Sequence, residues 1–193
     1  MLSSIHPLGE RARHNRWALT VAAFTMGAAI SGSLAGLALG AVGSLVPLPD
    51  RSGLMVTAGA ALAAGVLDMA RIRAPGPSRQ VNETWIGAFR GWVYGAGFGL
   101  ELGLGSVTYV VTWGVYASYL AALATASPTL GALVGAGFGV GRSLSLWLAG
   151  RVDRPSRLTG FNRRLASAGP LVRKTSAVAL SVLGVGLIAG GAL

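Results

Sequence analysis

Residues 85–127 read WIGAFRGWVYGAGFGLELGLGSVTYVVTWGVYASYLAALATAS, and this stretch decides the fold. After Arg90 it carries a single formal charge, Glu101. A bilayer core about 30 Å thick is crossed by roughly twenty helical residues, so this run is about twice the length that one straight span needs. No proline or polar cluster inside it marks a loop between two spans. The way in which it crosses therefore decides the topology.

The composition of the whole chain indicates a membrane protein. Of 193 residues, 52% are hydrophobic and only 11% are charged, with a mean hydropathy of +0.60. A soluble domain carries about a quarter charged residues. Low charge and long apolar runs together predict an all-α, polytopic transmembrane helical bundle whose main partner is the lipid bilayer. The net charge of +10 comes from arginines in short blocks between apolar runs. This positive-inside pattern argues against a nucleic-acid partner.

Several chemistries are excluded or disfavoured by residue counts. The chain has no cysteine, which excludes disulfides, thiolate metal sites and thiol redox chemistry by this chain. Its two histidines, His6 and His14, both lie in the N-terminal arm, so we expect no metal site within the membrane. No phosphate-binding loop, catalytic triad or metal motif occurs. We therefore expect no catalytic residue, no cofactor and no enzymatic activity.

Charge between the apolar runs predicts the topology. Residues 1–16 form a basic arm that we expect in the cytoplasm, and the apolar run after it exceeds the 7–15 residues of a signal-peptide core. The basic connections 71–84 and 150–175 should also be cytoplasmic, which requires an even number of crossings between them. The long run then crosses once. The expected spans lie near 17–46, 54–70, 86–126, 129–149 and 176–193.

This five-span arrangement puts the N-terminus in the cytoplasm and the C-terminus outside. Glycine, alanine and arginine usage is typical of a high-GC bacterium, so we expect the inner membrane of a bacterium. A single crossing by the long run needs a tilt or a break, and its glycines make the middle the natural place for one. Backbone that leaves a helix inside a membrane is tolerated only where protein or a water cavity satisfies it. Broken helices of this kind recur in the binding sites of transporters.

Glycines repeat every four residues in three apolar runs. Small residues at this spacing form one face of a helix and let two backbones approach closely in lipid. We therefore predict that helices pack through three glycine sets: Gly32, Gly36 and Gly40; Gly95, Gly99 and Gly103; and Gly131, Gly135 and Gly139.

Two charges lie well inside apolar runs. Glu101 is interpreted either as a protonatable or cation-coupling site or as a structural lock between helices, because a carboxylate at membrane depth faces a cavity or a partner. Arg142 is the obvious partner for Glu101, and it could instead extend to the interface near Arg151. Asp68 lies three residues before Arg71, which predicts an interfacial ion pair.

Hydroxyl groups follow the expected break. Thr108 and Thr112 lie four residues apart, and Tyr109 lies between them. These side chains could line a polar path for transport or gating. Threonines in membrane helices also bond the carbonyls of their own helix, which is the simpler interpretation.

The second half of the chain resembles a known family. Residues 97–150, GFGLELGLGSVTYVVTWGVYASYLAALATASPTLGALVGAGFGVGRSLSLWLAG, are similar to the second repeat of CcdA-type cytochrome c biogenesis proteins. Those proteins are relatives of the transmembrane core of DsbD-type thiol reductases and, more distantly, of LysE/TauE-like membrane transporters. The run NRWALTVAAFTMGAAISGSLAGLALGAVGSL, residues 15–45, resembles the second helix of the family.

The departures from this family matter as much as the likeness. Its members carry Pro-Cys motifs in the first and fourth helices, and those cysteines move electrons across the membrane. The fourth-helix position falls near Val107, Thr108 and Tyr109 here, and the first helix is missing. The resemblance therefore implies the fold of the family without its thiol redox activity.

Two functions of different classes follow. The first is a transporter-like protein that moves a small solute or ion, with a glycine-broken helix and Glu101 as its ionisable element. The second is a non-transporting subunit or scaffold that packs against a partner membrane protein or another copy of itself. The missing first helix favours the second, because an incomplete bundle gains from a partner.

Overall fold

A computed structural model describes residues 5–46, 50–77, 84–107, 110–151 and 155–191. Over these residues the regular structure is entirely helical, which confirms the predicted all-α class. Within this described part of the chain, three helices are long and apolar enough to cross a membrane: α2 (Trp17–Gly43), α3 (Asp50–Met69) and, over residues 167–190, α8 (Pro155–Gly191). The predicted count of five spans stays a prediction. The remaining elements are α1 (Pro7–Ala12), α4 (Trp85–Ala88), α5 (Gly91–Gly103), α6 (Gly114–Ala124), α7 (Pro128–Leu148) and the short 3-10 helix η1 (Ala149–Arg151).

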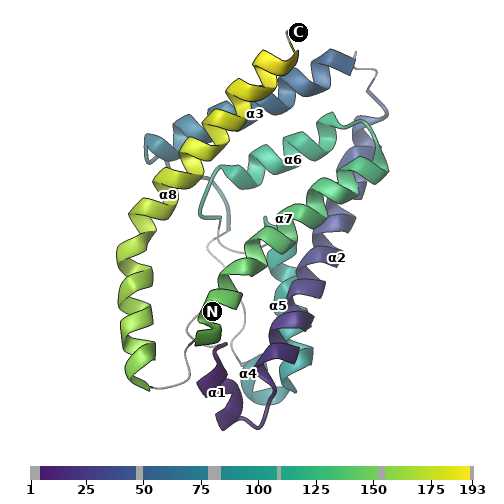
Figure 1. Ribbon diagram of the computed structural model, residues 1–193. Coiled ribbons are helices and arrows are strands. Elements are labelled where there is room, and N and C mark those ends of the chain that lie inside the picture. The colour runs from purple at the N-terminus through teal and green to yellow at the C-terminus, as the bar shows by residue number, and fades with distance from the viewer. Residues whose placement is uncertain (1–4, 47–49, 78–83, 108–109, 152–154, 192–193) are drawn as a thin grey trace.

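Helix α2 is the centre of the fold, and α5 and α7 pack along it (Figure 1). A Cβ atom added to Gly32 or Gly36 would overlap the carbonyl oxygen of Gly135 or Gly131 on α7, well inside the 3.0 Å that real Cβ contacts respect. The order of these pairs shows that α7 runs antiparallel to α2. Glycine at these positions lets the two helix backbones come into van der Waals contact. In lipid this close packing stabilises the helix pair, because the hydrophobic effect does not drive helices together there.

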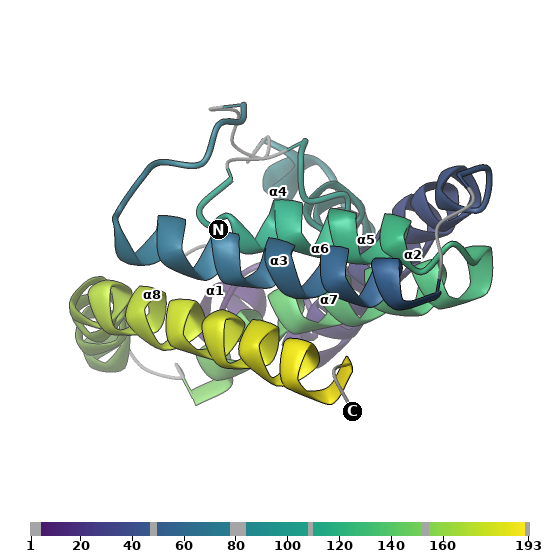
Figure 2. The same cartoon turned by 90° about the horizontal axis from the view of Figure 1, so that it is seen from above.

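A second layer consists of α6, α3 and α8, with α3 between the other two (Figure 2). Gly65 of α3 lies against Ala177 and Ser181 of α8, and Gly184 of α8 lies against Ala58 of α3. These two helices are therefore antiparallel and also meet through small residues. Large apolar side chains of α8 are exposed, such as Val182 at 65%, as expected of a helix that faces lipid or a partner.

The long run of residues 85–127 forms three helices with a break between α5 and α6. Gly95 and Gly103 of α5 lie against Thr20 and Ala28 of α2, and Leu123 near the end of α6 lies against Gly43. Helix α5, the break and α6 thus follow one another along α2 in the same direction. At 1.5 Å per residue α5 is about 20 Å long and α6 about 17 Å, so neither helix alone is long enough to cross a bilayer.

The predicted basic loop at 150–175 is wrong, because α8 begins at Pro155 and continues for 37 residues. Proline is favoured at the first position of a helix, where its missing N–H costs nothing. The predicted last span is the second half of this helix, and the candidate membrane segment within it covers residues 167–190.

Candidate functional site

The break between α5 and α6 places two helix ends inside an otherwise apolar bundle. The last carbonyls of a helix and its first N–H groups have no partner within that helix. They also carry partial charges, negative at the C-terminal end and positive at the N-terminal end. Charged side chains of other helices supply the partners at both ends of the break. At the start of α5 the partner is the uncharged side chain of Asn15, which lies beside the buried Glu10. This set of three helix ends is the candidate site.

Arg142 of α7 binds the C-terminal end of α5. Its Nη1 atom donates to the carbonyl oxygens of Leu102 at 3.3 Å and Gly105 at 3.5 Å. The Tyr119 hydroxyl donates to the carbonyl of Leu104 between them. Gly105 has a φ of +72°, the left-handed conformation that commonly ends a helix and that glycine adopts without strain. A cation beside these carbonyls has the sign that the helix dipole favours.

The structure shows neither of the two positions that the sequence suggests for the Arg142 side chain, which are a pair with Glu101 and an extension to the interface near Arg151. Its guanidinium lies over the ring of Phe138, with 5.5 Å from Cζ to the ring centroid, so the side chain turns back along α7 and away from Arg151. Glu101 is half-buried, and no hydrogen bond or ion pair connects it to another described residue. Helix geometry explains this choice, because side chains lean toward the N-terminus of their own helix. That direction brings Arg142 to the end of α5.

Asp68 of α3 binds the N-terminal end of α6. Its carboxylate is only 4% exposed and accepts hydrogen bonds from the Thr112 hydroxyl and, at 3.1 Å, from the backbone N–H of Trp113. The predicted ion pair between Asp68 and Arg71 is wrong. Arg71 follows the end of α3 with a positive φ of 58° and is exposed, while Asp68 faces α6. A buried anion gains more from free N–H donors of a helix N-terminus than from an exposed arginine.

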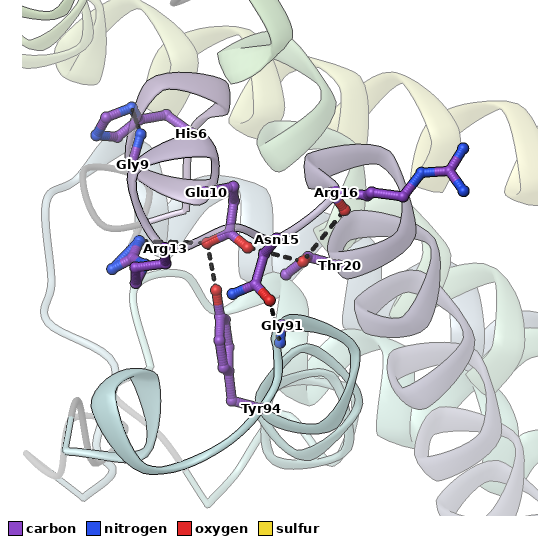
Figure 3. Close-up of polar contacts among 9 residues, drawn as sticks. All are labelled: His6, Gly9, Glu10, Arg13, Asn15, Arg16, Thr20, Gly91 and Tyr94. Carbon is purple, nitrogen blue, oxygen red and sulfur yellow. Dashed lines mark hydrogen bonds and ion pairs between the residues drawn. The ribbon is translucent and has the colours of Figure 1, made fainter.

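Glu10 of α1 lies at the start of α5 and is fully buried (Figure 3). Its carboxylate accepts hydrogen bonds from the Thr20 hydroxyl at 2.8 Å and from the Tyr94 hydroxyl, and it forms an ion pair with Arg13 at 3.2 Å. The carbonyl oxygen of the Asn15 side chain accepts from the first N–H group of α5 at 3.2 Å. The arm is therefore folded onto α2 and α5 from residue 5 onward.

The sequence arguments do not single out Glu10, because it lies in the basic arm outside the apolar runs. The signal was present in the order His6, Pro7 and Glu10, which places a capping side chain, a first-turn proline and a first-turn acid at helix-start positions. His6 does cap α1, since its Nδ1 atom accepts from the N–H group of Gly9 at 3.1 Å. Nothing in the sequence indicates which helix α1 contacts.

The remaining predicted site residues are the three hydroxyl-bearing ones, Thr108, Tyr109 and Thr112. Thr112 lies at the break and bonds Asp68 instead of a helix carbonyl. Thr108 and Tyr109 lie outside the described residues. A small cavity of about 10 Å³ lies beside the break, which is space for one water at most. Glycines, Ser118, Tyr119 and apolar side chains line this cavity, which is too small for a solute.

We expect Arg142→Met to lower the free energy of unfolding by about 1–3 kcal/mol, because it leaves carbonyls of α5 without donors while keeping the volume of the side chain. Arg142→Lys should lose less, since an ammonium also donates to helix carbonyls. The measurement is unfolding in detergent micelles. Equal stability of all three proteins would contradict the role given to Arg142.

Fold and site together define a helical, membrane-type protein built around a discontinuous helix whose ends are bound by charges from other elements. The methylamine utilization protein MauF of Paracoccus versutus is 32% identical to the chain over 149 residues. The match covers 74% of this chain and 54% of MauF, so the chain spans about half the length of this relative. No family model and no solved structure matches the chain. The resemblance to CcdA-type proteins stays a prediction.

Proposed function

We propose that the chain is a non-transporting, non-enzymatic membrane subunit that packs against a partner membrane protein. The observation that carries this proposal is the use of charge at the break. Arg142 and Asp68 are both engaged with helix ends, and the cavity lined by Gly103 and Tyr119 holds one water at most. A transport site needs a charge that changes partners and a cavity of the size of its solute. Charges that are held by helix ends suit a rigid scaffold instead.

The likeness to MauF gives this proposal its context. The name of that protein concerns methylamine utilization, and we propose that the present chain serves the same process as a membrane-embedded accessory protein. The proposal retains two expectations from the sequence. The first is a CcdA-like arrangement of helices that lacks redox chemistry, and the second is an N-terminus in the cytoplasm. Helix α8 offers a surface for a partner, because it packs mainly against α3 and its valines at 178, 182 and 185 are more than half exposed.

A second function, transport of a small solute or ion, is favoured by Glu101 alone. Its carboxylate is half-buried in an apolar helix and has no hydrogen-bond partner among the described residues. Such a group at membrane depth is costly and is often the ionisable element of a transport path. Methylammonium is the cation to test first, given the likeness to MauF.

Flux into reconstituted vesicles separates the two functions. We expect uptake of labelled methylammonium, and of protons followed by a pH-sensitive dye, to equal that of empty vesicles. Glu101→Gln should change neither. Uptake above empty vesicles that is lost in Glu101→Gln would contradict the proposal and support transport. As a positive test, the chain should restore growth on methylamine to a Paracoccus versutus strain that lacks MauF, and Glu101→Gln should restore it equally. Failure to restore growth would contradict the proposed context.

A further inference from the structure

The contact between α1 and α5 depends on a histidine that must be neutral. The Nδ1 atom of His6 accepts a hydrogen bond from the N–H group of Gly9 and so caps α1. An imidazole that accepts at Nδ1 carries no proton there, and a protonated one donates at both nitrogens. His6 is only 7% exposed, so the ring lies within the fold of the arm. Protonation of His6 therefore removes the cap and places a charge in a buried position.

The cap is coupled to the cluster that binds α1 to α5. Glu10 lies one turn after His6 and connects α1 to Thr20 of α2 and Tyr94 of α5 (Figure 3). Arg13 binds Glu10, and both His6 and Arg13 lie close to Gly9. A helix of six residues has few bonds of its own, so loss of its cap weakens the whole contact.

We propose that α1 is a pH-sensitive latch on the N-terminus of α5, closed while His6 is neutral and released when the compartment that the arm faces becomes acidic. Among the described residues, the charged groups that act on His6 are Glu10 of α1 and Arg13 just after it, and Tyr94 of α5 contacts Glu10. Helix α2 presents the uncharged Thr20, and η1, which also contacts α1, carries Arg151. The proposal is independent of whether the protein is a scaffold or a transporter.

The direction of the pH effect follows from the pKa of His6. Burial lowers this pKa below its ordinary value of 6.5, the charge of Arg13 lowers it further, and Glu10 partly opposes them. Release of α1 restores the ordinary value, so the released form binds more protons as the pH falls below 6.5. Well above 6.5 both forms are neutral at His6 and the latch does not respond. Between pH 7.5 and pH 5.5 the released fraction gains at most about tenfold.

Thiol labelling tests the latch, because the chain has no cysteine of its own. Ile5 is fully buried beside α1, so Ile5→Cys should react with a maleimide only after α1 is released. Ala12 is an exposed residue of α1, so Ala12→Cys reports the intrinsic pH dependence of the labelling reaction. The ratio of the two rates should rise from pH 7.5 to pH 5.5, by at most about tenfold. His6→Asn, which caps without titrating, should abolish the rise and keep Ile5→Cys protected at pH 7.5.

Two further outcomes decide which group is the sensor. A rise that persists in His6→Asn and disappears in Glu10→Gln would overturn the assignment to His6, as would the absence of any rise. Hydrogen exchange of residues 7–12 in the unsubstituted protein follows the same release without a cysteine. Exchange that is equally slow at both pH values would also overturn the proposal.

Discussion

Gly135→Leu should lower the free energy of unfolding by about 3 kcal/mol or more and separate α2 from α7. A Cβ atom at this position overlaps the carbonyl oxygen of Gly32, which belongs to the backbone of α2 and has no rotamer through which to move away. Overpacking of a core costs about 1–3 kcal/mol where side chains can adjust. Contact with a backbone atom puts this substitution at or beyond the upper end of that range.

Gly137→Leu is the matched control for Gly135→Leu. It lies on the same helix two residues later, and a Cβ atom added there meets nothing within 4 Å. Its free energy of unfolding should stay within about 0.5 kcal/mol of the unsubstituted protein. Both variants are measured by unfolding in the same detergent. Equal losses at the two positions would contradict close packing as the reason for glycine at position 135, because helix propensity alone favours leucine over glycine at both positions.

Glu10→Ala should lower the free energy of unfolding by about 2–4 kcal/mol. The carboxylate is fully buried and accepts from Thr20, Tyr94 and Arg13, so its removal takes one acceptor away from each of these three groups. Breaking a buried charged network in this way costs more than an exposed ion pair is worth. Arg13 is about one-third exposed and recovers some hydration, which limits the loss.

Arg11→Ala is the control for Glu10→Ala, because Arg11 lies on the same short helix and is exposed. It should change stability by less than about 0.5 kcal/mol. Tyr94→Phe removes one donor to Glu10 and should be partly redundant with Glu10→Ala, giving a coupling energy of about 1 kcal/mol in a double-mutant cycle. Additive effects of the two substitutions would show that Glu10 and Tyr94 do not depend on one another.

The sequence predicts the helical class and the break in the long run, because both depend on local signals. Apolar runs without charge indicate helices that suit a membrane, and glycines between residues 95 and 105 indicate where a long helix can end. Gly105 takes the left-handed conformation at that end, while Gly95 and Gly99 lie inside α5 against α2. The same residue type thus ends one helix and packs another, and only the fold tells the two uses apart.

The partners of the charges could not be predicted from the sequence. Glu101 and Arg142 have opposite charge and similar expected depth, which favours a pair. In the structure Arg142 instead donates to backbone carbonyls. Every residue has a backbone carbonyl, so the residue types do not indicate which one will accept a hydrogen bond. Asp68 is separated from Trp113 by 45 residues, so no local pattern connects them. Long-range contacts that one partner makes through its backbone are invisible to arguments based on residue types.

A double-mutant cycle between Glu101 and Arg142 tests the central claim that the charge at the break binds a helix end. The free energy of unfolding is measured for Glu101→Gln, Arg142→Met and the double variant. We predict a loss of about 1–3 kcal/mol for Arg142→Met, little loss for Glu101→Gln, and a coupling energy below about 0.5 kcal/mol. Equal losses in both single variants, with no further loss in the double variant, would show that the two side chains form a pair and would contradict the account.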